Sequence, residues 1–363
     1  MIKIFKYKTL LFASLVLMSG CKKLYDLPEE KEYFSPNVNY GNKLFEPILG
    51  RTALMGEFNA DKSTLPMQFE ILNVRYGDGR PATDMLQVKP TLAWIAPYTG
   101  KETSLAQIEA KRKVENRPMF EVRSSGQFIL WESSTNELIP PRPADSSTFI
   151  QDTRFFDLRV KNTGGEKIIK DFQVRPWRER PYEPSNDINP YTGEVARDPR
   201  DPRNPLKRDY ITPYFNNVVG AQSNQNLENN DSRKDIVVFI RPFTSGGTGN
   251  SLRFVFLDKD GNSINPESFN ETKWDQLVHG FNMQKTADYV QFDVAYPIPL
   301  VRLVTPYTNN DGSRANSEFA YSRKGFGGTR STASIGLDYS IYRKGNWEIV
   351  FQFRRENPKF EDE

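Results

Sequence analysis

The sequence predicts a mainly β protein made of tandem antiparallel β-sandwich domains, immunoglobulin-like in type, with one or two short helices. Three observations support this prediction. Apolar and polar residues alternate with a period of two, tight-turn sequences separate the alternating segments, and a proline-rich stretch divides them near the middle of the chain. The chain has 363 residues, of which 37% are hydrophobic and 13% aromatic, which is enough for two domains with separate cores.

The period of two is clearest in three segments, and each is expected to be a strand with one buried face. Met67, Phe69 and Ile71 lie in the first, Phe156, Leu158 and Val160 in the second, and Val290, Phe292 and Val294 in the third. Roughly 12 to 16 strands are expected in all, and a single sheet of that size would curl or split. Two packed sandwiches are therefore the economical arrangement.

Two hairpins are expected in the C-terminal part. The first joins the alternating segments 335–341 and 347–353 through a turn at 343–346. The second follows the apolar positions of segment 252–256 and turns at 258–262, where Asp-Gly supplies the left-handed backbone of a tight turn.

Two short helices are expected between strands. Ser104 begins a capping-box pattern that leads into the run 108–115, which Pro118 ends. Thr272 begins a short helical turn that Gly280 can close.

The domain boundary is expected near residue 210. Proline recurs too often in segment 178–214 for strands or helices, and segment 221–234 is polar and rich in Asn and Ser. The expected N-terminal β-sandwich domain covers residues 39–209 and ends in this Pro/Arg-rich connector. The expected C-terminal β-sandwich domain covers residues 210–363.

The first 38 residues predict export and a lipid anchor. Three lysines precede an apolar run over 9–18, which is too short to cross a hydrocarbon core of about 30 Å and is typical of a signal peptide over 1–20. Ser19 and Gly20 directly precede Cys21, the only cysteine, and this resembles the lipobox of bacterial lipoproteins. We therefore expect Cys21 to be the lipid attachment site and residues 21–38 to form a charged tether.

Loss of the signal peptide also removes the positive charge. The formal net charge is +3, and the three lysines of the signal account for the whole excess. A neutral mature chain lacks the cationic excess of a nucleic-acid binder, so no nucleic-acid partner is expected. The single histidine, His279, excludes multi-histidine zinc sites and is expected at the surface or at the end of a short helix.

No motif predicts catalysis. The glycine-rich segments 245–249 and 325–328 lack the Lys-Ser/Thr ending of a phosphate loop. Segment 258–262 has Asp and Asn at alternate positions but lacks the later glycine and carboxylate of a calcium loop. No catalytic, cofactor-binding or metal residue is therefore named. Paired carboxylates remain an open enzymatic option, because a glycosidase needs only two of them about 5 to 10 Å apart.

Several segments together resemble one lipoprotein family of the Bacteroidetes, domain of unknown function 5007. They are FEPILGRTALMGEFNADKSTLPMQFEILNVRYGDG, YTGKETSLAQIEAKR, MFEVRSSGQFILW and RERPYEPSND. The resemblance implies a lipoprotein with tandem β-sandwich domains, of a kind found near glycan-uptake loci that pair a TonB-dependent transporter with a surface lipoprotein. It implies no catalytic residue.

The candidate ligand-binding residues lie in the connector. Trp177, Arg178, Arg180 and Tyr182 place aromatic faces beside guanidinium groups, which can stack on sugar rings and hydrogen-bond to hydroxyls. The alternative is that the rings pack the connector onto the two domains while the charged groups form ion pairs. Both interpretations stay open at this point.

These observations predict an outer-membrane lipoprotein, facing the cell surface rather than the periplasm, that acts as a non-catalytic binding or assembly module accessory to a glycan-uptake system. Its expected partners are the membrane, through the lipid, and a glycan or an outer-membrane transporter complex. The alternatives are a glycan-active hydrolase with paired carboxylates and a structural or adhesin component of the surface.

Overall fold

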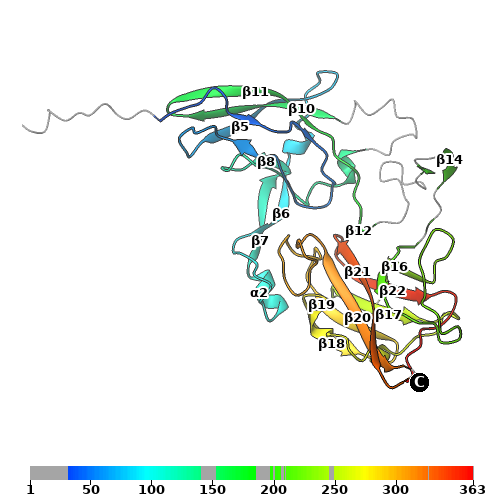
Figure 1. Cartoon of the computed structure of the whole chain (residues 1–363). Helices are drawn as coiled ribbons and strands as arrows, with labels where there is room; N and C mark the ends of the chain where they lie inside the picture. Colours follow the sequence, from blue (N-terminus) through cyan, green and yellow to red (C-terminus); the bar gives the residue numbers. More distant parts are fainter. Residues whose placement is uncertain are drawn as a thin grey trace, which may run out of the picture.

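The protein is mainly β, with several antiparallel and mixed open sheets and one short α-helix among the described residues (Figure 1). The structure is a computed structural model and describes residues 32–139, 153–184, 197–198, 201–205, 208, 210–244, 249–325 and 327–362. The expected signal peptide and Cys21 lie outside these residues. We call residues 32–174 the N-terminal half and residues 210–362 the C-terminal half.

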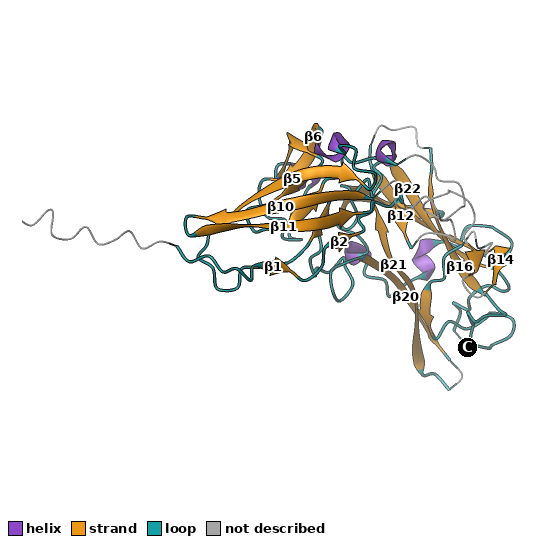
Figure 2. Ribbon diagram, turned by 90° about the horizontal axis from the view of Figure 1, so that it is seen from above, coloured by secondary structure: helices purple, strands orange, loops and turns teal. Residues whose placement is uncertain are grey.

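The largest sheet of the N-terminal half has the order β2-β11-β10-β5. Its strands are β2 (Leu44–Phe45), β11 (Gly165–Val174), β10 (Arg154–Asn162) and β5 (Gln68–Tyr76). The pairing of β2 with β11 is parallel, whereas the other two pairings are antiparallel. Figure 2 shows β5, β10 and β11 side by side as one layer. The alternating segments at 67–71 and 156–160 fall in β5 and β10, which confirms those two strands.

A second, three-stranded sheet faces the same core. It consists of β3 (Ala53–Met55), β9 (Phe128–Leu130) and β8 (Phe120–Val122), with β3 and β8 at its edges. Phe128 on β9 is fully buried, and its ring centroid lies 5.2 to 5.7 Å from those of Phe120, Phe156 and Phe172. Aromatic rings from both sheets therefore make the centre of this core.

Two short strand pairs complete the N-terminal half. One joins β1 (Asn39–Tyr40) to β4 (Phe58–Asn59). The other is a ribbon of β6 (Val88–Trp94) and β7 (Arg112–Pro118), which extends toward the C-terminal half (Figure 1).

The C-terminal half contains a five-stranded sheet in the order β16-β22-β17-β19-β18. The strands are β16 (Ile236–Pro242), β22 (Asn346–Phe353), β17 (Ser251–Leu257), β19 (Tyr289–Val294) and β18 (Gly280–Lys285). The central pairing of β17 with β22 is parallel. The alternating segment at 290–294 falls in β19, as expected.

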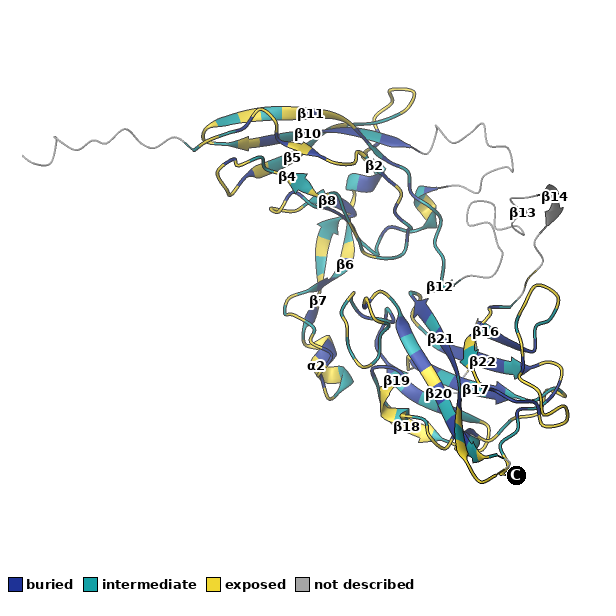
Figure 3. Cartoon of the chain, viewed as in Figure 1, coloured by how far each residue is buried: buried dark blue, intermediate teal, exposed yellow. Residues whose placement is uncertain are grey.

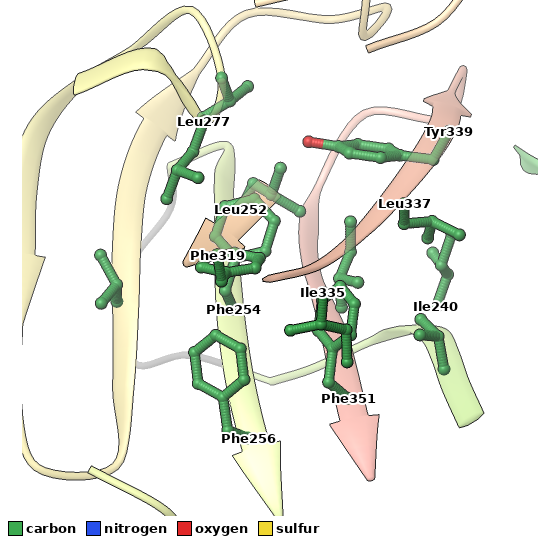
Figure 4. Packing of buried hydrophobic residues seen from close by; sticks show 14 of the residues in the cluster. Ile240, Leu252, Phe254, Phe256, Leu277, Phe319, Ile335, Leu337, Tyr339 and Phe351 are labelled. Carbon is green, nitrogen blue, oxygen red and sulfur yellow. The ribbon is translucent and has the colours of Figure 1, made fainter. Parts of the chain in front are cut away.

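A smaller sheet packs on this one through β20 (Ala315–Lys324) and β21 (Arg330–Ile341), while β12 (Tyr182–Glu183) and β15 (Tyr214–Asn216) also pair with β21. Phe319 on β20 is fully buried and lies 5.2 Å from Phe254 and 4.7 Å from Phe256 on β17, measured between ring centroids (Figure 4). It also lies 5.4 Å from Phe351 on β22. The remaining described strands, β13 (Arg197–Asp198) and β14 (Asp201–Pro205), pair with each other.

The expected hairpin between segments 335–341 and 347–353 is wrong. The two segments are strands β21 and β22, but β21 pairs with β20 whereas β22 pairs with β16 and β17. The turn at 343–346 therefore carries the chain from one sheet to the other. Alternation of apolar residues identifies the buried face of each strand, and that face points to the same core in either arrangement.

The helix expected from Ser104 toward Pro118 is much shorter than the sequence suggests. Ser104 does cap α2 (Leu105–Glu109), accepting a hydrogen bond from the backbone N–H of Gln107 at 3.3 Å. Residues 112–118 instead form β7, because pairing with β6 satisfies their backbone groups. The helical turn expected after Thr272 is a 3₁₀ turn, η5 (Trp274–Gln276); further 3₁₀ turns are η1 (Thr83–Leu86), η2 (Asn136–Leu138) and η4 (Pro266–Ser268).

The turn expected at 258–262 is confirmed, but the hairpin expected around it is wrong: β17 pairs with β19 and β22, and the chain after the turn makes only an isolated bridge between Leu257 and Ser263. Asp258 Oδ1 accepts the backbone N–H groups of Asp260 and Asn262 at 2.9 and 2.8 Å, and Gly261 adopts a φ of +87°. These side-chain bonds close the turn that follows β17.

The last part of the expected tether belongs to the folded body. Val38 and Ser35 are fully buried, and Phe34 packs against the N-terminal core. Lys167 Nζ donates to the carbonyl oxygens of Pro36 and Val38 at 2.6 and 2.9 Å. Residues 34–38 thus pack on the N-terminal half. None of the described helices has the length and apolar character needed to cross a bilayer.

Candidate functional site

The four candidate ligand-binding residues lie where the chain leaves β11 and crosses to the C-terminal half. The backbone N–H of Trp177 donates to the carbonyl oxygen of Pro47 at 2.8 Å, and its carbonyl accepts from Leu49 at 2.9 Å. Arg178 Nη1 donates to the carbonyl oxygen of Ile139. The Trp177 and Arg178 side chains are half-buried. This part of the connector therefore continues the parallel pairing of β2 and β11.

Arg180 and Tyr182 belong to a joint between the halves. Tyr182 lies in β12, which pairs with the end of β21, and its ring lies 5.8 Å from that of Trp347. Glu183 forms ion pairs with Arg51 at 3.2 Å and with Arg180 at 3.7 Å. Burial raises the pKa of Tyr182. In the structure these two residues make packing and ion-pair contacts of the kind that the alternative interpretation describes.

A second contact between the halves is made by residues 95–111, which we call the ribbon tip. His279 of the C-terminal half is buried there, so its expected position at the surface is wrong. Its Nε2 donates to the carbonyl oxygen of Glu102 at 2.7 Å, and its Nδ1 accepts from the Tyr98 hydroxyl. The Tyr307 ring stacks on it at 4.6 Å. Both ring nitrogens of His279 are hydrogen-bonded, and these bonds join the ribbon tip to the C-terminal half.

Glu102 is the buried charge of the same contact. Burial raises its pKa, but the Lys111 ammonium and the N–H groups of Glu102 and Thr99 outweigh that effect and hold the pKa at about 2. The carboxylate is therefore ionised in the folded protein over the whole range in which it would titrate in an unfolded chain.

This arrangement predicts a pH-dependent stability. Because the folded pKa of Glu102 lies below its ordinary value of 4.5, its stabilisation is complete above that value and is lost as the pH falls toward 2. Thermal unfolding measured from pH 7 to pH 3 should show a smaller loss of stability for Glu102→Gln than for the unmodified chain. Glu137→Gln, at a carboxylate that is 81% exposed, should follow the unmodified curve.

Five described carboxylates are buried, and each has a partner: Glu102, Asp157, Asp235, Glu348 and Glu356. The partners are respectively Lys111, Asn73, Arg233, the pair Arg241 and Arg253, and Ser223. Burial raises the pKa of Asp157, but hydrogen bonds from Asn73 and the Asp171 backbone outweigh this effect and lower the pKa overall. The hydrogen bond from the Ser223 hydroxyl lowers the pKa of Glu356. A glycosidase acid needs a raised pKa instead. The described residues also include no group of three His, Cys, Asp or Glu side chains arranged to hold a metal.

An open groove of about 600 Å³ lies in the N-terminal half between β2 and β3. Its lining includes Leu44 and Phe45 from β2, Ala53 and Met55 from β3, and Pro47. β2 and β3 are edge strands of the two sheets that share the N-terminal core, so the groove marks where this pair of sheets stays open. Its volume falls in the range of ligand sites, and its lining is mostly apolar.

The lining of the groove also includes polar residues. Glu46 and Glu57 are exposed acidic residues on its rim, and Glu46 pairs with Arg175 at 3.4 Å. The Asn42 amide accepts from the Leu44 N–H at 3.0 Å and donates to the Leu44 carbonyl at 2.7 Å. Asn42 thereby occupies the backbone groups that an added strand would use on β2. The groove can receive apolar side chains but is protected against simple strand addition at Leu44.

Gly56 lines the groove in a backbone conformation that favours glycine, so its replacement should lower the stability of the protein. Its φ is +74°, and an added Cβ would lie 3.2 Å from atoms of both Phe45 and Phe128. Gly56→Ala should lower the free energy of unfolding by about 1–3 kcal/mol, because alanine is strained in this conformation. Urea denaturation can measure the loss against Gly41→Ala, where the added methyl meets nothing within 4 Å. Equal midpoints for the two variants would contradict this role of Gly56.

The sequence analysis singled out none of the groove residues as functional. Their nearest signal is the pair of glycines, Gly41 and Gly56, that flank short apolar segments. Such a signal identifies turns but cannot show that two edge strands diverge around a cavity.

Comparison with known proteins gives one match. The family model described as a domain of unknown function (DUF5007) matches residues 58–362. Neither the curated proteins nor the solved structures gave a match.

Proposed function

The chain belongs to the DUF5007 family, a domain of unknown function, and from this starting point we propose that it is an outer-membrane lipoprotein, exposed at the cell surface, that acts as a non-catalytic assembly module. Its partner is an outer-membrane protein complex, such as a transporter for glycan uptake, which inserts an apolar segment into the groove. The lipid anchor is Cys21. The groove between β2 and β3 is the observation that carries the proposal.

The N-terminal sequence supports the placement at a membrane. The lipobox-like residues before Cys21 predict acylation, and two or three acyl chains hold a protein stably. Phe34 packs in the folded body only 13 residues after Cys21, and a chain of that length reaches at most about 43–47 Å. The folded body therefore works close to the membrane surface, within reach of other outer-membrane proteins.

The two halves fit a pair of β-sandwich domains. In each half, two sheets contribute side chains to one hydrophobic core. The parallel pairings of β2 with β11 and of β17 with β22 depart from the antiparallel pattern of immunoglobulin domains. We therefore propose tandem sandwiches with a strand order of their own.

The chemistry of the groove favours a protein segment over a glycan. Sugar-binding sites commonly present an exposed aromatic face, whereas the only aromatic residue lining this groove is Phe45, which is 5% exposed. Apolar side chains would gain by burial against Leu44, Ala53 and Met55. The acidic rim at Glu46 and Glu57 suits a segment that carries a basic residue beside its apolar ones.

Two adjacent substitutions test this proposal. Met55 lines the groove, whereas the neighbouring Leu54 does not line it and is 54% exposed. In a native pull-down of the lipidated protein from membranes, Met55→Lys should lose the co-purifying outer-membrane partner, and Leu54→Lys should retain it. Glu57→Lys on the exposed rim serves as a second groove variant if Met55→Lys does not fold.

The same experiment can refute the proposal. Retention of the same partners by folded Met55→Lys and Glu57→Lys would show that the groove is not the binding site. A polysaccharide array gives a second test. If the unmodified chain binds a glycan there and both groove variants lose that binding, the partner of the groove is a glycan and not a protein.

A further inference from the structure

The β6–β7 ribbon leaves one strand edge without a partner. Residues 95 and 111 are hydrogen-bonded across the ribbon, as are residues 87 and 119, so the odd-numbered residues between them hold the two strands together. The backbone groups of even-numbered residues therefore point away from the ribbon. Among the described strands, β6 pairs only with β7, and β7 only with β6.

The outer edge of β6 is protected. Pro90 has no N–H group, and the N–H of Leu92 donates to Glu132 Oε1 at 2.6 Å. On β7, by contrast, the outward N–H groups of Val114 and Asn116 have no hydrogen-bond partner in the described part of the chain. An unprotected edge of this kind is a template for pairing with another strand.

The ribbon also exposes an apolar face beside that edge. Val88, Pro90, Leu92, Val114 and Pro118 share one face, because cross-strand partners lie on the same side. Val88 is 61% exposed and Val114 is 63% exposed. Figure 3 shows exposed positions along this ribbon. Isolated exposed side chains are ordinary, but a set that borders a free edge indicates an interaction surface.

The charges on β7 identify a second copy of this chain as the occupant. If two β7 strands pair antiparallel about Val114, Lys113 of each copy lies opposite Glu115 of the other. Val114 of one molecule then lies opposite Val114 of the other, and Arg112 of each lies opposite Asn116 of the other. Lys113 is exposed and has no ion-pair partner among the described residues, whereas Glu115 pairs with Arg117 at 2.7 Å and is still 28% exposed. Both Lys113–Glu115 pairs are therefore of opposite charge. The same register sets Arg117 opposite Lys111, and each of these two cations is already paired within its own copy, Arg117 with Glu121 and Lys111 with Glu102.

We propose that two copies of this chain associate through their β7 edges in this register and form a continuous sheet β6-β7-β7-β6. The contact is self-complementary, as a two-fold interface requires. It is also small, so it is weak between molecules free in solution. Anchoring both copies in one membrane raises their effective concentration and makes the contact possible there.

Cysteine cross-linking in the intact lipidated protein tests the register. The Val114 residues of the two molecules lie opposite each other at the two-fold axis. Val114→Cys in native membranes should therefore form a disulfide-linked dimer under mild oxidation. Asn116→Cys is the matched control, because its two copies would stand roughly 13 Å apart along the strands, too far for a disulfide. The chain with Cys21 alone gives the background.

A charge exchange tests the recognition. Lys113→Glu in the Val114→Cys background should reduce the cross-linked fraction roughly tenfold, because both cross-strand pairs become repulsive. Adding Glu115→Lys restores opposite charges and should restore the cross-link. Equal cross-linking of Val114→Cys and Asn116→Cys, no cross-linking of either, or no rescue by the double exchange would each overturn the proposal.

Discussion

Phe319→Ala should lower the free energy of unfolding of the C-terminal half by about 3–5 kcal/mol, the usual cost of truncating a fully buried phenylalanine. The ring is fully buried between β20 and the five-stranded sheet, within 4.7 to 5.4 Å of Phe254, Phe256 and Phe351. Its removal leaves a cavity where the two sheets of this half meet. Urea denaturation followed by tryptophan fluorescence measures the loss.

Two further variants serve as comparisons for Phe319→Ala. Met283→Ala removes an apolar side chain of the same half that is 47% exposed, and it should shift the midpoint little. Phe128→Ala opens the corresponding cavity in the N-terminal core. If the halves unfold as separate units, Phe319→Ala and Phe128→Ala should each shift a different transition. A loss below about 1 kcal/mol for Phe319→Ala would contradict the central role of this ring.

Arg112→Met should release the ribbon tip from the C-terminal half, at a cost of about 2–3 kcal/mol for the lost charged hydrogen bonds. The Arg112 side chain is only 3% exposed. Its Nη1 donates to the carbonyl oxygen of Tyr296 at 2.6 Å, and its Nη2 binds Glu109. Methionine keeps the apolar part of the side chain, which packs near Trp94, but leaves the buried carbonyl without its donor.

Limited proteolysis measures this release directly. Cleavage within residues 95–111 should become faster in Arg112→Met, while the cores of the two halves stay resistant. Lys101→Met is the control, since Lys101 is an exposed lysine of the same ribbon tip. Identical cleavage rates in the two variants would show that Arg112 does not fasten the tip.

The candidate site illustrates where inference from sequence stops. Trp177, Arg178, Arg180 and Tyr182 have the composition of a sugar platform, yet the same residues suit a joint that packs two halves together. The contacts that these residues make with Pro47, Ile139 and Trp347 join segments distant in sequence, so the sequence alone does not reveal them. The groove between β2 and β3 leaves even less trace, because it depends on how far two short edge strands diverge.

By itself, the sequence determined the β class, the buried face of strands such as β10 and β19, and the turn at 258–262. These features follow from residues close together in the chain, whose spacing and turn chemistry act locally. Tertiary structure alone decided that β21 and β22 lie in different sheets, that β7 replaces most of a helix, that His279 is buried, and that the groove exists. Each of these depends on contacts between distant segments, and alternation along one strand carries no record of which strand will lie beside it.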